Sequence, residues 1–108
     1  MNYAASINDP IERFKLVMVN SIAYFYTAKV FEKPLNPVLG ETYQARGADG
    51  ANIFLEQTCH HPPTTHFYID GPNNGYTMHG HQSFSVVLWP NSVVITTVGQ
   101  KTTRFHDG

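Results

Sequence analysis

The stretch Glu56–Pro63, EQTCHHPP, places two adjacent histidines directly before two prolines. The apolar residues 53–55 predict a strand that leads into it. Because proline lacks a backbone donor and has a restricted φ, we expect regular strand pairing to stop at the two prolines. His60 and His61 should then lie at a stiff strand exit, where two imidazoles can donate hydrogen bonds to an anionic group such as phosphate.

Upstream of this stretch, the sequence predicts a helix over residues 9–28. Asp9 is a suitable N-cap, Pro10 suits the first helical position and Glu12 the third. One apolar stripe with spacings of three and four consists of Ile11, Phe14, Met18, Ile22 and Phe25. We expect this helix to be well buried and to end near residue 28, because prolines follow at 34 and 37.

After Gly40 the hydrophobic period changes from helical to two, which is typical of strands. Glycine-, proline- and asparagine-rich turn signals separate short strands predicted at about 41–46, 51–58, 65–70, 76–89 and 92–98. Alternation along 76–89 indicates an antiparallel sheet with one apolar face. The predicted fold is α+β and mainly β: an N-terminal helix packed on an antiparallel β-meander over 41–105, in one domain over 1–108.

Composition narrows the class of protein. A chain of 108 residues has room for one domain, and its net charge of −1 argues against broad nucleic-acid binding. The sequence has neither an apolar run of about 18 residues nor the start of a signal peptide. Its single cysteine, Cys59, excludes an internal disulfide and fits a reducing compartment. A cytoplasmic domain without a cofactor is expected.

A second polar segment lies in the loop 33–42, KPLNPVLGET. Two prolines stiffen this loop, so its side chains lose little conformational freedom when a ligand binds. Lys33 offers a point positive charge, and Asn36 offers both a donor and an acceptor. From the loop alone, a rigid connector with a solvated lysine is the favoured interpretation of these residues.

Together the two segments resemble a known family. Residues 33–43, KPLNPVLGETY, are similar to the KPFNPLLGETYE segment of the oxysterol-binding protein family. Glu56–Pro63 resembles that family's signature, EQVSHHPP, in the same order and at the same spacing. The upstream helix start at residues 9–14 also fits, and the resemblance runs from about residue 9 to 105.

The resemblance implies a fold and a function. The family's domain is a nearly complete antiparallel β-barrel around a hydrophobic tunnel that binds a sterol or another lipid and, in many members, phosphatidylinositol 4-phosphate. It implies that His60 and His61 contact the inositol-ring phosphate, and that Lys33 and Asn36 contact the glycerol-side phosphate and headgroup. Non-catalytic lipid transfer at membranes or membrane contact sites follows, with binding that weakens above neutral pH as the imidazoles lose charge.

The chain also departs from the family. The family's domain is several times longer, so residues 1–108 form only a partial version of the oxysterol-binding β-barrel. An open sheet would expose an unpaired edge and an apolar face. An interaction module, or a homo-oligomer that covers the open sheet, is therefore the alternative function.

Two other kinds of site compete for the same residues. Zinc accepts histidine and cysteine ligands, and His66, His79 and His81 add to the candidates. Neighbouring histidines, however, should point to opposite sides of an extended chain. The same divergence disfavours an enzyme with Cys59 as nucleophile and a neighbouring imidazole as base. We therefore predict neither a metal site nor catalytic residues.

Overall fold

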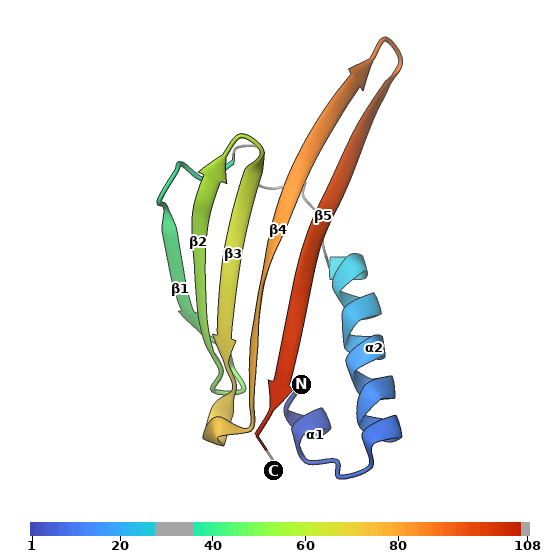
Figure 1. The fold of residues 1–108 in the computed structure, drawn as a ribbon, viewed down its shortest axis with the longest axis vertical. Coiled ribbons are helices and arrows are strands. Elements are labelled where there is room, and N and C mark those ends of the chain that lie inside the picture. The colour runs from blue at the N-terminus through green and yellow to red at the C-terminus, as the bar shows by residue number, and fades with distance from the viewer. Residues whose placement is uncertain (28–35, 107–108) are drawn as a thin grey trace.

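The chain forms an open antiparallel sheet with two helices at one side and base (Figure 1). The computed structural model describes residues 1–27 and 36–106. The elements are α1 (Asn2–Ala5), α2 (Pro10–Thr27), β1 (Thr42–Arg46), β2 (Asn52–His60), β3 (Pro63–Asp70), the short 3₁₀ helix η1 (Pro72–Asn74), β4 (Tyr76–Trp89) and β5 (Ser92–Phe105). The strands pair in chain order, β1-β2-β3-β4-β5, and every pairing is antiparallel. The predicted α+β meander is confirmed.

The strand boundaries correct two expectations. Pairing does not stop at the prolines, because β2 continues to His60 and its partner there is Pro63, the first residue of β3. Proline is tolerated at the first position of a strand, where its missing donor interrupts little of the ladder. β5 also runs well past the predicted end at residue 98, to Phe105.

The start of α2 has the predicted capping geometry. The carboxylate Oδ1 of Asp9 accepts hydrogen bonds from the backbone N–H groups of Ile11 at 2.8 Å and Glu12 at 3.1 Å. These bonds satisfy two donors that have no partner inside the helix. The described part of the helix runs to Thr27, and the predicted end near residue 28 lies outside the described residues.

The prediction that this helix is well buried is wrong. The described side chains of the apolar stripe, Ile11, Phe14, Met18 and Ile22, are exposed, and Phe14 is 62% exposed. α2 stands beside β5 (Figure 1) and reaches the sheet through long polar side chains. The Tyr24 hydroxyl donates to Gln82 Oε1 at 3.1 Å, and Lys101 Nζ donates to Ser21 Oγ at 2.8 Å. The stripe identifies the apolar side of the helix. Little of the described chain packs against that side.

The buried core is small and lies at the base of the sheet. In the described part of the chain, the buried hydrophobic residues are Ala4, Ala51, Tyr76 and Met78. Tyr76 begins β4 and packs against Gly71, where an added Cβ would lie 2.5 Å from its ring. Burial, and then the nearby Asp49 carboxylate, raises the pKa of the Tyr76 phenol above its usual value of 10.0, so the side chain stays neutral near physiological pH.

Arg13 ties the N-terminal residues to this core. Its Nε donates to the carbonyl of Ala4 at 3.2 Å, and Nη2 donates to the carbonyl of Ile7. The guanidinium lies 4.8 Å from the ring centroid of Phe105, a cation–π contact with the end of β5. One side chain of α2 therefore joins α1, the following linker and the sheet.

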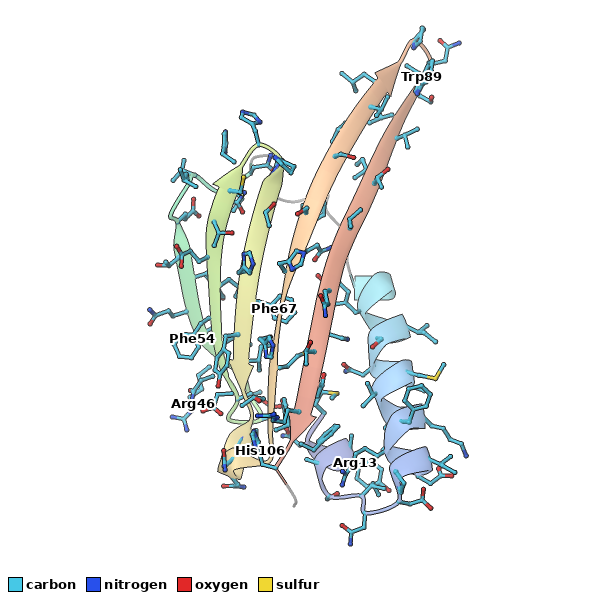
Figure 2. All side chains as sticks on the ribbon, in the orientation of Figure 1. Arg13, Arg46, Phe54, Phe67, Trp89 and His106 are labelled. Carbon is cyan, nitrogen blue, oxygen red and sulfur yellow. The ribbon has the colours of Figure 1, made fainter. Side chains whose placement is uncertain are left out.

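The β4–β5 hairpin extends beyond the other strands and carries an exposed apolar surface (Figure 1). Figure 2 shows Trp89 at its tip, far from Arg13 at the base. Leu88 is 76% exposed. Its other exposed large apolar residues are Val86, Val87, Trp89, Val93, Val94, Ile95 and Val98. In the described sheet β1 and β5 are the unpaired edges, so the open edge expected from the sequence is present. The exposed apolar residues of the hairpin lie on both of its faces, because neighbours along a strand point to opposite sides.

Candidate functional site

His60 and His61 come together at the turn between β2 and β3. His60 is the last residue of β2, and His61 lies in the turn, joined to Pro62 by a cis peptide bond. Both side chains are exposed, and their ring centroids are 4.6 Å apart with an edge-on angle of 66°. The expectation that adjacent histidines diverge is wrong here, because only His60 is in the strand. Two imidazoles thus face solvent side by side.

A β-bulge precedes the histidines. The register shifts between Gln57 and Cys59, so Thr58 is the extra residue of β2. The Thr58 hydroxyl donates to the carbonyl of Thr64 at 3.3 Å, and it lies 2.7 Å from Nδ1 of His66. Because the hydroxyl proton is used by the carbonyl, this contact favours donation from the His66 N–H. These two contacts of Thr58 therefore hold the bulge of β2 against β3.

The thiol of Cys59 donates to the backbone carbonyl of His61 at 3.4 Å. This contact spans the turn and helps to close it. A catalytic thiol needs a base that takes its proton, and a carbonyl oxygen cannot do so. The Cys59 thiol thus bonds across the turn that follows β2, and this contact lends no support to a nucleophile.

Gln57 is the most deeply buried polar residue of this region, and we did not predict it. Its side chain is 1% exposed. Nε2 donates to the carbonyl of Cys59 at 3.0 Å, and the Thr65 hydroxyl donates to Oε1 at 2.5 Å. A polar residue on the sheet face that carries Ile53 and Leu55 is the sequence signal that could have revealed it.

The second polar segment, the loop 33–42, is hydrogen-bonded to the backbone of Gln57 through its last residues. The backbone N–H of Gly40 donates to the carbonyl of Gln57 at 2.8 Å, and the N–H of Gln57 donates to the carbonyl of Glu41 at 2.9 Å. A turn precedes this pairing: Glu41 N–H donates to the carbonyl of Val38 at 2.9 Å, and Gly40 has φ of 78°. That φ suits the third position of a type II turn, which favours glycine.

The outcome for the four predicted site residues is mixed. His60 and His61 are exposed and adjacent, and Asn36 is exposed in the loop that leads to Gly40. Lys33 lies outside the described residues. The structure joins the two segments through Gln57, so they belong to one substructure and not to two distant parts of the sheet.

A different group of histidines lies on the outer face of the sheet. His66 and His81 are cross-strand partners with ring centroids 5.3 Å apart. With His79 they line a shallow groove of about 300 Å³. No group of three potential metal ligands forms a site among residues 1–27 and 36–106. Likewise, no helix in the described segments is both long and apolar enough to span a bilayer.

Comparisons with known proteins agree with the geometry. The family described as "Oxysterol-binding protein" matches residues 1–108. "Oxysterol-binding protein 9" of Dictyostelium discoideum is 36% identical over 97% of this chain, and "Oxysterol-binding protein-related protein 1" of Mus musculus is 35% identical over 96%. The chain spans 24% and 11% of the lengths of these two relatives.

A solved structure shares the fold. The crystal structure of the Osh1 ORD domain in complex with ergosterol superimposes with a TM-score of 0.82 at 28% identity. The match covers 99% of this chain and 26% of that domain's chain. The open sheet thus corresponds to one part of a larger fold, which explains why so much apolar surface is exposed here.

Proposed function

Because the chain belongs to the oxysterol-binding protein family, we propose that residues 1–108 form a truncated, non-catalytic lipid-binding domain. Its ligands are a sterol or another lipid and phosphatidylinositol 4-phosphate. Lys33, Asn36, His60 and His61 contact the headgroup. The protein acts in the cytoplasm, at the surface of membranes or at membrane contact sites.

The observation that carries this proposal is the paired, solvent-facing imidazoles at the β2–β3 turn. Rings 4.6 Å apart can both donate to one phosphate group. The hydrogen bonds between Gly40, Gln57 and Glu41 anchor the loop that bears Asn36 in the same substructure. A preorganised site loses little conformational entropy when an anion binds.

The apolar side of the ligand has separate support. The Osh1 domain was crystallised with ergosterol. Here Tyr43, Leu55 and Phe67 share one row across the sheet, on the face that α2 approaches. That row and the exposed stripe of α2 are apolar surfaces against which the body of a lipid can pack.

Lipid pickup tests the proposal directly. We expect the purified chain to co-sediment with phosphatidylcholine vesicles that contain phosphatidylinositol 4-phosphate more strongly than with phosphatidylcholine alone. Mass spectrometry of the recovered protein should detect bound phosphoinositide or sterol. If the protein carries no lipid and forms a stable dimer in solution, the self-associating module is the better account, since a second copy can cover the open face and edge of the sheet.

A further inference from the structure

Gln57 lies where the two polar segments meet, and all four of its hydrogen-bonding groups are engaged. Its backbone N–H and carbonyl bond to the loop at Glu41 and Gly40, while its side-chain amide bonds to Cys59 and Thr65. We propose that Gln57 is a positioning residue, which holds the histidine turn and the Asn36 loop in one fixed arrangement. Its consequence for lipid binding rests on the proposed function above.

The backbone of Gln57 fixes the loop. The bonds at 2.8 and 2.9 Å extend the pairing with β2 to residues 40–41, just before the start of β1. The Glu41 carboxylate strengthens this arrangement, because its Oε2 accepts from the Val38 N–H at 2.9 Å. The loop is thereby held from Val38 to Glu41, two residues after Asn36.

The side chain of Gln57 fixes the histidine turn. The bulge at Thr58 interrupts the regular ladder between Gln57 and Cys59, so the position of the following residues depends on other bonds. The Nε2 bond to the Cys59 carbonyl supplies one of them, directly before His60. The Thr65 hydroxyl orients the amide by bonding its oxygen.

Glutamine is the side chain that this position requires. A leucine of similar size would leave the Cys59 carbonyl and the Thr65 hydroxyl without their amide partners in a buried place, at a cost comparable to a lost hydrogen bond each. A glutamate accepts the Thr65 hydroxyl but cannot donate to the Cys59 carbonyl when ionised. A buried site with both a donor and an acceptor therefore selects the amide.

The first experiment uses NMR on the ligand-free chain and does not depend on the proposed function. At a centroid distance of 4.6 Å, ring protons of His60 and His61 should give cross-peaks to each other. We expect these cross-peaks to be lost in Gln57→Leu and weakened in Thr65→Val, which removes only the donor to Oε1. Gln44→Leu changes an exposed glutamine of β1 and should retain them.

Thr65→Val keeps the test decisive if Gln57→Leu does not fold, since it leaves Gln57 in place. Wild-type cross-peaks in Thr65→Val and in folded Gln57→Glu would overturn the proposal. So would their loss in Gln44→Leu, because the effect would then not be specific to Gln57.

The second experiment measures the consequence for binding. For phosphatidylcholine vesicles with phosphatidylinositol 4-phosphate, we expect affinity to fall about tenfold in Gln57→Glu and about threefold in Thr65→Val, which correspond to about 1.4 and about 0.65 kcal/mol. Uptake of ergosterol from vesicles without phosphoinositide should stay unchanged. Equal loss of both ligands would overturn the positioning role. If the wild-type chain binds no phosphoinositide, the proposed function fails, and the NMR result alone judges Gln57.

Discussion

Replacement of both His60 and His61 by alanine is expected to lower the affinity for phosphatidylinositol 4-phosphate vesicles by about 100-fold or more. A hydrogen bond to a charged group contributes about 1.5–3 kcal/mol, and two such bonds at the lower value correspond to about 100-fold. Both rings are exposed, so their removal should leave the unfolding midpoint nearly unchanged. Vesicle co-sedimentation at several lipid concentrations measures the affinity.

The matched control is the double variant His79→Ala/His81→Ala. It removes two imidazoles from the same sheet but from β4, where they line the outer groove and not the β2–β3 turn. We expect its vesicle affinity to equal that of the wild type. If both double variants lose binding equally, the attraction is a general effect of positive charge, and the phosphate contact at His60 and His61 is refuted.

Local rules predicted the elements of the fold well. The cap at Asp9 is a short-range interaction between a carboxylate and two nearby N–H groups, so the sequence contains all the information needed to predict it. The alternation in β4 and the turn signals between strands act over a few residues as well, and the meander follows from them.

Short-range rules of this kind could not predict whether α2 is buried or exposed. Its apolar stripe indicates that one face of the helix packs against another apolar surface. Neither the stripe nor the helix propensity identifies the segment that provides this surface. The match to about a quarter of a solved domain gives the physical reason for its exposure, because the surfaces that complete that fold lie in the remaining three-quarters of that chain. A short amphipathic segment can thus be predicted as a helix while its partner remains unknown.

The candidate site likewise has residues that the sequence predicts and contacts that it does not. His60 and His61 could be found from their sequence pattern, whereas their side-by-side rings depend on His61 being in the turn. Gln57 acts through contacts with Glu41 and Thr65, which lie far from it or on another strand. Such contacts depend on register and on the bulge, and a single sequence does not specify where a bulge falls.

Tyr76→Ala is expected to unfold the chain. Truncation of a large buried aromatic residue costs about 3–5 kcal/mol, while whole domains are stable by only about 5–15 kcal/mol. Tyr76 is 4% exposed, and it is the largest member of a small hydrophobic core in the described structure. Its ring also packs on Gly71 and pairs with Phe105 at a centroid distance of 6.4 Å. Circular dichroism and NMR peak dispersion at room temperature measure the loss of fold.

Two variants separate the causes of this effect. Tyr76→Phe keeps the ring and removes the hydroxyl, so it should cost less than about 1.5 kcal/mol. Tyr68→Ala removes a tyrosine from the middle of the same sheet, but that side chain is 45% exposed and should leave the chain folded. A folded Tyr76→Ala, with an unfolding midpoint like that of Tyr68→Ala, would mean that the base of the sheet is not the stabilising core. Stability would then have to come from the strand ladder alone, which the exposed β4–β5 hairpin makes difficult.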